Sequence, residues 1–240
     1  MRLKLHLSGS AKPVGWCLYA LLFVCLAVQS EAESEHRKFP TLTDLRPYVL
    51  PMRVPVFTYR NGHRQHHTEH CTGTLLATEP YTIVTAWHCF DGLQDLTRPP
   101  KGFLGDKWIP LKLIASGDSM AADWALLALD GHSDLVLPRG LSMTADTPDI
   151  FSIAGFSDKR PGESTELSID HGCIVTGQLD GWFTTNCKAS KGASGGPAVG
   201  WVEDELVIFG VISAKNEVQT LLITPVSSEI YPPGILPSPP

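Results

Sequence analysis

The chain has 240 residues and a formal net charge of −6 at pH 7, because 25 Asp and Glu outnumber 19 Lys and Arg. This balance leaves no basic footprint and argues against nucleic acid as a partner. Hydrophobic residues make up 43%, enough for a core, and the 21 Gly and 19 Pro are too few to predict disorder. The length allows one large domain or two small ones.

The first 32 residues differ in kind from the rest. Three basic residues lead into an uncharged, mostly apolar run of fifteen, Val14–Val28. This run is shorter than the roughly 18 residues that span a bilayer, and the small residues Ser30 and Ala32 follow at cleavage spacing. We predict a secretory signal peptide over Met1–Ala32, cut after Ala32 or Ser30, and a secreted or periplasmic mature chain. The alternatives are a short membrane anchor and, through Cys25, a lipoprotein.

Cysteine usage agrees with export. Cys17 and Cys25 leave with the predicted signal peptide, and the mature chain keeps four cysteines: Cys71, Cys89, Cys173 and Cys187. Four cysteines in an exported chain predict two disulfides, with three possible connectivities. We expect residues 33–240 to form an acidic, monomeric, globular protein with no stable membrane association after signal removal.

Short strands dominate the mature sequence. No stretch of ten or more residues has a convincing period of 3.6, and turn residues such as Asn61-Gly62 and Asp180-Gly181 separate brief apolar or alternating runs. Many short strands at near-regular spacing predict a sandwich or barrels rather than an alternating α/β fold. The predicted strands are Val54–Arg60, Thr72–Ala77, Tyr81–Ala86, Leu111–Ser116, Trp124–Leu129, Phe151–Phe156, Cys173–Leu179, Trp182–Cys187, Leu206–Ala214 and Leu221–Val226.

The ends of the mature chain have loose compositions. Glu33–Lys38 is entirely polar, and five of the 19 prolines fall within Pro232–Pro240. We expect the C-terminal tail to be extended and solvated, with a proline-recognition ligand as the alternative.

Three segments carry residues with catalytic chemistry: Val84–Cys89, Asp123–Leu127 and Lys191–Pro197. Hydrolysis by a serine needs a hydroxyl beside an imidazole base, a buried carboxylate that fixes the imidazole tautomer, and donors for the oxyanion. The glycines around Ser194 let substrate backbone approach and let the N–H groups of Gly192 and Ser194 turn to a common point. Asp123 leads an alternating apolar strand, which suits a carboxylate held in a dry place.

Chain order separates two folds that share the pattern Gly192-x-Ser194-x-Gly196. The nucleophile elbow of α/β-hydrolases also fits the pattern, but its His follows the Ser, whereas the last His here is His171. The elbow is therefore excluded. The order His88, Asp123, Ser194 is the trypsin-like order.

From Val54 to Val226 the sequence resembles the trypsin/chymotrypsin family of serine peptidases. Thr85–Cys89 is similar to the family's Thr-Ala-x-His-Cys block, Asp123–Leu127 to its Asp-hydrophobic-Ala-Leu-Leu block, and Gly192–Pro197 to its Gly-x-Ser-Gly-Gly-Pro block. The resemblance implies an all-β fold of two six-stranded antiparallel barrels, at about 45–137 and 145–230, with the active site in the cleft between them and a Pro-rich tail at 231–240. It also implies that Cys71 pairs with Cys89.

The resemblance implies an exported serine endopeptidase that hydrolyses protein or peptide substrates. Ser194 would be the nucleophile, His88 the base and Asp123 the group that orients His88, with the backbone N–H groups of Gly192 and Ser194 forming the oxyanion hole. No metal or organic cofactor is implied. The alternative is a catalytically silent binding protein on the same fold, its cleft blocked by Lys215 or its oxyanion hole misformed.

Some residues depart from the digestive members of the family and resemble a compact bacterial-type, glutamyl-endopeptidase-like branch. Ala193 replaces the Asp that precedes the nucleophile, and no C-terminal helix is evident. Lys188 stands roughly at the base of the specificity pocket and could select acidic side chains, but Ile212 replaces the His that glutamate-selective members carry. The predicted substrate-binding residues are Lys188, Ser213 and Lys215.

A hairpin argument predicts the second disulfide. Suppose that Leu179-Asp180-Gly181 is a three-residue loop with Gly181 left-handed. Residues whose numbers add up to 360 then face each other across the hairpin, and Cys173 lies opposite Cys187. A two-residue loop would place Cys173 opposite Lys188 instead.

Two weaker candidates remain beside these. Asp118 lies near Asp123 but lacks the apolar strand behind it. Four histidines follow the Asn61-Gly62 turn and could ligate zinc or copper, but on a strand they divide between two faces, so a solvated hairpin rim is the favoured interpretation. They are His63, His66, His67 and His70.

Overall fold

The computed structural model describes residues 39–91, 93–95, 97–129, 136–157, 166–215, 220–226, 230 and 236–237, with the side chains of 93, 94, 215, 236 and 237 not among them. The predicted signal peptide, Glu33–Lys38 and most of the Pro-rich tail lie outside these residues. No helix among the described residues is both long enough and apolar enough to cross a membrane.

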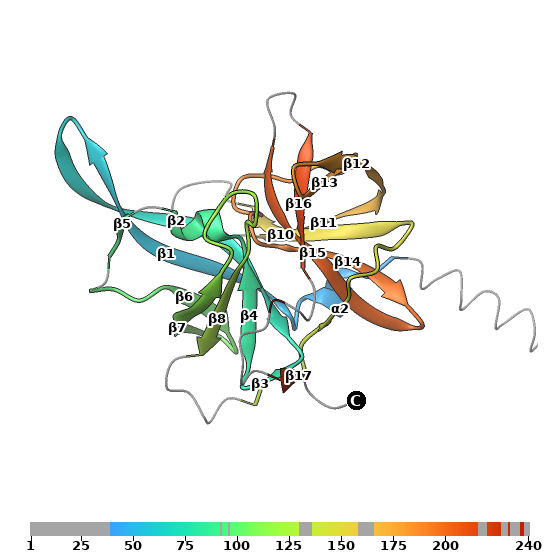
Figure 1. Ribbon diagram of the computed structural model, residues 1–240. Coiled ribbons are helices and arrows are strands. Elements are labelled where there is room, and N and C mark those ends of the chain that lie inside the picture. Colours follow the sequence, from blue (N-terminus) through green and yellow to red (C-terminus); the bar gives the residue numbers. More distant parts are fainter. Residues whose placement is uncertain are drawn as a thin grey trace, which may run out of the picture. The chain divides into compact units, whose positions relative to one another are not determined.

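The first sheet closes into a six-stranded antiparallel barrel (Figure 1). Around the barrel β1 pairs with β2, then come β4, β8, β7 and β6, and β6 pairs again with β1. The short strand β5 (Leu93–Gln94) pairs with β1 outside the ring. Every second residue of β1 from Leu50 to Val56 is buried, as expected for a strand with one face on a core. The six strands are β1 (Val49–Arg60), β2 (His63–Leu76), β4 (Thr82–Thr85), β6 (Lys101–Leu104), β7 (Lys107–Ser116) and β8 (Ala125–Leu129).

The second sheet forms the other barrel of the predicted fold. Its path runs β11-β10-β14-β15-β16-β13-β12, and only Ile174 separates the two end strands, β11 and β12, along the chain. One bent strand therefore supplies both ends of the path and completes a circuit of six. The strands are β10 (Phe151–Ser157), β11 (Glu166–Cys173), β12 (Val175–Leu179), β13 (Trp182–Thr185), β14 (Pro197–Val202), β15 (Glu205–Lys215) and β16 (Leu221–Pro225), and β9 (Ser142–Met143) pairs in parallel with β15.

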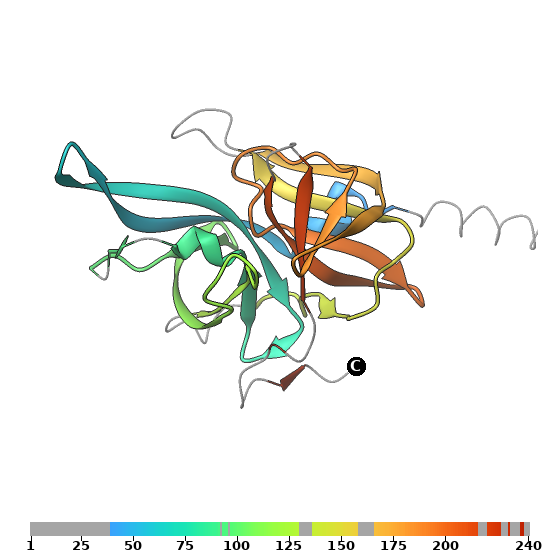
Figure 2. The same ribbon diagram turned by 45° about the horizontal axis from the view of Figure 1, so that its top comes forward.

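Short elements complete the described chain. Helix α2 (Leu42–Leu45) begins at a capping box between Thr41 and Asp44, and the 3-10 helix η1 spans Trp87–Phe90. Strand β3 (Thr78–Glu79) pairs with β17 (Leu236–Pro237) in a separate two-stranded sheet (Figure 2).

A shared apolar cluster joins the two barrels. Buried side chains of both sheets meet in it, which fixes how the two barrels pack because protein interiors leave few voids. Its members include Leu76, Val84 and Leu126 from the first barrel and Ala154, Val199, Ile208 and Val211 from the second.

Three strands of the barrels were not among those predicted: β6, β11 and β14. Strand β6 has only four residues, and one of them is Gly102. In β11 the alternation of apolar and polar residues is irregular because polar residues and Gly172 interrupt it. Strand β14 begins at Pro197 directly after the glycines of the Ser194 segment, and a Gly-Gly-Pro run is typical of a turn.

Candidate active site

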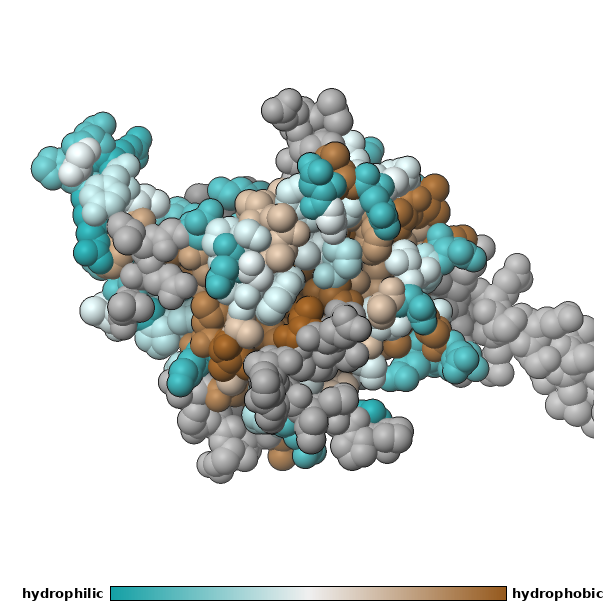
Figure 3. All heavy atoms as spheres, in the orientation of Figure 1, coloured by the Kyte–Doolittle hydropathy of each residue, from teal (hydrophilic) through white to brown (hydrophobic). Residues whose placement is uncertain are grey.

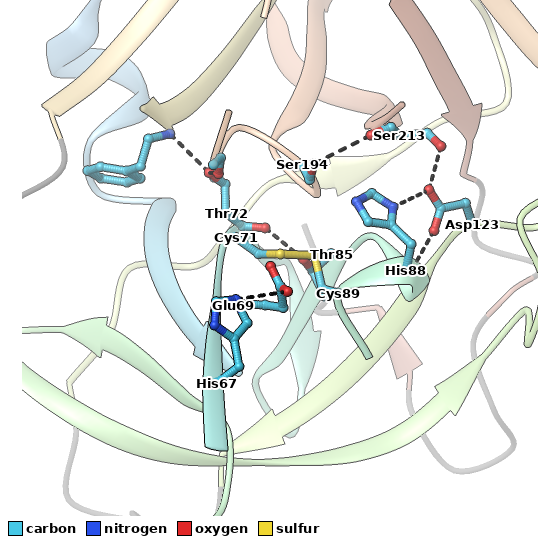
Figure 4. The surroundings of a disulfide bond; sticks show 12 residues. His67, Glu69, Cys71, Thr72, Thr85, His88, Cys89, Asp123, Ser194 and Ser213 are labelled. Atoms are coloured by element: carbon cyan, nitrogen blue, oxygen red, sulfur yellow. Dashed lines mark hydrogen bonds and ion pairs between the residues drawn. A yellow bond between two sulfur atoms is a disulfide. The ribbon is translucent and has the colours of Figure 1, made fainter. Parts of the chain in front are cut away.

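The three segments singled out in the sequence meet where the two barrels join (Figure 4). His88 lies in η1, immediately after β4, and Asp123 lies two residues before β8. Ser194 lies in the loop that enters β14 of the second barrel. The disulfide between Cys71 of β2 and Cys89 of η1, with a Cα–Cα distance of 6.5 Å, fixes the turn that carries His88.

Asp123 holds His88 through both of its carboxylate oxygens. Oδ2 lies 2.8 Å from His88 Nδ1, and Oδ1 accepts the backbone N–H of His88 at 2.7 Å. Ser213 Oγ donates a third hydrogen bond, to Oδ2. The Asp123 side chain is fully buried, whereas that of His88 is 27% exposed. Because a carboxylate only accepts, the proton of the neutral imidazole belongs on Nδ1 and Nε2 is free to act as a base.

Asp118 does not take part in this arrangement. It is exposed, and its carboxylate accepts a hydrogen bond from Ser116.

Ser194 is half-buried and lies beside His88 and Ser213 (Figure 4). Its Oγ donates to the carbonyl oxygen of Ser213 at 3.5 Å, a long contact, and no hydrogen bond joins the described side chains of Ser194 and His88. The structure thus brings all three residues together, with the hydroxyl turned toward Ser213.

The loop around Ser194 contains two glycines in the positive-φ region, which favours glycine. The N–H of Ala193 donates to Ser190 O at 3.1 Å, and Gly192 has a φ of 93° at the third position of this turn, which is typical of a type II turn. Gly195, with a φ of 81°, lies so close to Thr85 and Thr72 that no side chain fits there. Among the described residues, no acceptor binds the N–H groups of Gly192 and Ser194, so both donors are available.

Thr72 of β2 holds this loop from the opposite barrel. Its N–H donates to the carbonyl of Ser194 and its hydroxyl to the carbonyl of Gly192, both at 2.8 Å. The same hydroxyl accepts the N–H of Phe156 at 2.9 Å. Sequence reasoning missed Thr72, and its position next to Cys71 is the only signal that pointed there.

Ala193 is a buried small residue that packs closely against Gly155. It is 4% exposed, and a Cβ built on Gly155 would lie 2.5 Å from the Ala193 methyl. Gly155 and Ala193 therefore fit each other as a pair of small residues.

Cys173 pairs with Cys187, with a Cα–Cα distance of 5.3 Å, but the predicted three-residue loop is wrong. The loop has two residues, Asp180 and Gly181, both with positive φ, and Leu179 faces Trp182. A β-bulge between Val175 and Gly177 then shifts the register by one residue, so that Val175 faces Thr185. The bulge restores the alignment of the two cysteines that the short loop alone would have lost.

The three predicted substrate-binding residues have different surroundings. Lys188 is exposed, donates its backbone N–H to Asp170 Oδ2 at 2.7 Å, and lines a cavity of about 310 Å³ together with Ala193. The Ser213 side chain is buried against Asp123. Lys215 ends β15, and its side chain lies outside the described residues.

The histidines after the Asn61-Gly62 turn do not gather around a common point. His66 Nδ1 lies 3.1 Å from Asp95 Oδ2, and His67 Nε2 lies 3.2 Å from Glu69 Oε1. Within the described residues, the one group of metal-ligand types in mutual reach is Asp170, Cys173 and Cys187, and both of its sulfurs belong to the disulfide.

The sequence matches a family model, the trypsin-like peptidase domain, over residues 71–207, which is more than half of the chain. The chain therefore belongs to the trypsin-like peptidase family and is a serine peptidase. No curated protein matches the sequence.

Solved structures show the same fold. The thermostable serine protease AL20 from an extremophilic microorganism aligns with a TM-score of 0.58 at 17% identity, over 76% of this chain and 92% of that one. The active form of the Rv3671c protease from M. tuberculosis aligns with a TM-score of 0.55 at 17% identity, over 78% of this chain and 79% of that one. These likenesses agree with the two-barrel fold, and the glutamyl-endopeptidase-like branch stays a prediction.

Proposed function

We propose that the chain is an exported serine endopeptidase in which Ser194 is the nucleophile, His88 the general base and Asp123 the group that orients His88. The observation that carries this proposal is the buried Asp123 carboxylate, which fixes His88 beside Ser194 at the junction of the barrels. Ser213 supports the assignment because its hydroxyl binds the same carboxylate.

The first half of the reaction forms an acyl-enzyme. Ser194 Oγ bonds to the scissile carbonyl carbon while His88 Nε2 takes its proton, and Asp123 stabilises the imidazolium. As the tetrahedral intermediate collapses, His88 gives the proton to the leaving amine and the C–N bond breaks. Water then repeats the sequence to release the acid. In free enzymes the Ser–His hydrogen bond is often long or absent, which is compatible with the Ser194 hydroxyl facing Ser213 here.

Gly192 and Ser194 would supply the oxyanion hole. Thr72 binds the carbonyl oxygens of both residues, so these carbonyls are held away from the site while the N–H groups remain unpaired. Preorganised donors of this kind stabilise the charge that develops on the carbonyl oxygen of the substrate.

Export is supported by the two disulfides, since such bonds persist in oxidising compartments. We propose that Met1–Ala32 is a signal peptide and that residues 33–240 carry the peptidase, with Lys188, Ser213 and Lys215 on the substrate path. N-terminal sequencing of the chain recovered outside the cytoplasm should show a start at Glu33 or Glu31. An intact Met1 on membrane-bound protein would contradict the signal peptide.

A fluorophosphonate probe tests the catalytic assignment. The folded chain should be labelled at Ser194, and Ser194→Ala should lose the label and on the order of 10⁶-fold of turnover. Ser190→Ala, in the same loop, serves as the matched control and should keep both. Failure to label the folded chain would favour the silent binding protein on the same fold.

A further inference from the structure

One face of the β1–β2 hairpin carries a row of cationic and aromatic side chains. The hairpin pairs continuously from Val49↔Thr74 to Arg60↔His63 and projects beyond the first barrel (Figures 1 and 2). Directly opposite residues point to the same face of a sheet. Four such pairs share one face between residues 53 and 70. Pro55 and Thr68 form one of them, and we name the other three the arm stripe: Arg53 and His70, Phe57 and His66, Tyr59 and Arg64.

Aromatic rings hold the two arginines of the arm stripe in place. The Arg53 guanidinium lies 4.1 Å from the Trp108 ring centroid, and that of Arg64 lies 3.2 Å from the Phe57 centroid. Both arginines are exposed, and no ion pair joins either of them to a described acidic side chain. A stacked guanidinium keeps its N–H edges free, so it is prepared to bind carboxylates.

The arm stripe begins at the candidate active site. A cavity of about 830 Å³ reaches from Gly192 to Arg53, His70 and Trp108. Cys71 also lines this cavity, and its disulfide partner is Cys89, the residue after His88. Because His88 would protonate the leaving amine, the cavity lies on the side where the C-terminal part of a substrate departs.

Charge separates the inner cavity from the outer arm. Inside the cavity, the two positive charges of Arg46 and Arg53 are balanced by the two negative charges of Asp106 and Glu166. Farther out, residues 54–68 hold two arginines, Arg60 and Arg64, and no acidic residue, in a chain whose net charge is −6. The tip of the hairpin is accordingly hydrophilic in Figure 3. The excess of positive charge thus lies beyond the cavity, along the arm.

We propose that the arm stripe is a second binding site for the substrate, which takes acidic side chains several residues beyond the scissile bond on its C-terminal side. The proposal rests on the proposed peptidase function. His70 and Arg64 are six strand positions apart, or about 20 Å, so an extended peptide of roughly eight residues beyond the scissile bond reaches both arginines. The partner is a polypeptide, because the stripe continues from the cavity that would hold the peptide backbone.

The test uses the full chain and one cleavable peptide core with two alternative eight-residue C-terminal extensions, one rich in Glu and one of Ser and Gly. At low salt we expect kcat/KM to be about 5-fold higher for the acidic extension, through KM, as two exposed ion pairs allow. The ratio should approach one at 0.5 M salt because exposed charges are screened. In the double variant R53Q/R64Q the ratio should fall to near one.

Arg60→Gln is the matched control, since Arg60 faces His63 on the opposite face of the same hairpin and its variant should keep the ratio. Equal loss in both variants would mean a general charge effect and would overturn the proposal, as would a wild-type ratio near one. Binding of the acidic peptide to S194A, measured by fluorescence anisotropy, tests the arm even if turnover is absent. If a sulfated polysaccharide binds through Arg53 and Arg64 while the acidic peptide does not, the polypeptide assignment is wrong.

Discussion

At the scale of single residues, Thr72 shows how one hydroxyl sets the geometry of a loop in the other barrel. Its hydroxyl donates a buried hydrogen bond to the carbonyl of Gly192 and accepts a partly buried one from the N–H of Phe156, so both partners lose a hydrogen bond when the hydroxyl is removed. An unsatisfied buried polar group costs about 1–3 kcal/mol. Thr72 is a positioning residue because it touches the loop around Ser194 through its carbonyls, on the side away from the proposed oxyanion hole.

We predict that Thr72→Val, which keeps the shape of the side chain, lowers kcat about 10- to 100-fold with little change in KM. The reason is that the N–H groups of Gly192 and Ser194 lose their fixed direction, which matters most in the transition state. Thr72→Ser, which retains the hydroxyl, should recover most of the turnover. Steady-state kinetics on one peptide substrate measure the difference. If Thr72→Val turns over like the wild type, the hydroxyl does not position the loop.

At the scale of elements, the segment after β5 is tied to the hairpin by one buried carboxylate, Asp95. It accepts hydrogen bonds from the Thr97 hydroxyl at 2.5 Å and from Arg98 Nε at 2.6 Å, and it meets His66 of β2. The hydrogen bond from Thr97, together with Arg98, holds the pKa of the Asp95 carboxyl well below its usual range, against the opposing effect of burial. The charged form of Asp95 therefore stabilises the folded chain.

The sign of the pH dependence follows from this depressed pKa. An unfolded Asp titrates near pH 4, so the unfolded chain binds the proton first as the pH falls, and the stabilisation by Asp95 is full above about pH 5. It declines as the pH drops below about 4. We predict that Asp95→Asn lowers the free energy of unfolding at pH 7 and that its deficit relative to the wild type shrinks toward pH 3. Urea denaturation at each pH measures it, with the exposed Asp146→Asn as the control. A deficit independent of pH would contradict the role of the charge.

The same scale shows what the sequence could and could not predict. His88, Asp123 and Ser194 could be singled out as candidates because each lies in a short pattern whose residue types suit the chemistry. Thr72 could not, since its role depends on a contact between segments 120 residues apart. The Cys173–Cys187 pair was predicted from a wrong loop length, because a bulge between Val175 and Gly177 compensates for the shorter turn.

At the scale of the whole molecule, the candidate active site exists only while both barrels keep their packing. The first barrel supplies His88, Asp123 and Thr72, and the second supplies Ser194 and Ser213. The apolar cluster that joins the barrels draws on the strands that carry these residues. Val84 lies in β4, the strand before His88, and Val211 lies in β15 together with Ser213. The relative positions of the site residues therefore depend on how the two barrels pack against each other.

The conformation of the Ser194 loop bears on whether activity needs a free N-terminal amine. By resemblance to the digestive peptidases, a newly cut N-terminal amine would pair with the Asp before the nucleophile and shape the oxyanion hole. Here that position holds the buried Ala193, packed against Gly155, and the turn at Gly192 is already formed. A buried ammonium without a partner costs several kcal/mol, so insertion at Ala193 is not expected. Thr72 and the Cys173–Cys187 disulfide hold the loop in place without an inserted amine.

We therefore predict that turnover does not depend on a free N-terminal amine. Three chains should be compared with one peptide substrate: one that starts at Glu33, one that starts at Phe39, and one that starts at Phe39 with an acetyl cap. All three should agree in kcat/KM within about 2-fold, because none of them needs an ammonium group to shape the N–H groups of Gly192 and Ser194. If only the uncapped, trimmed chain is active, an amine does insert, and Asp170 becomes its expected partner, since among the described residues it alone places a carboxylate on the cavity beside Ala193. In that case Asp170→Asn would reduce the activity of the trimmed chain to that of the capped one.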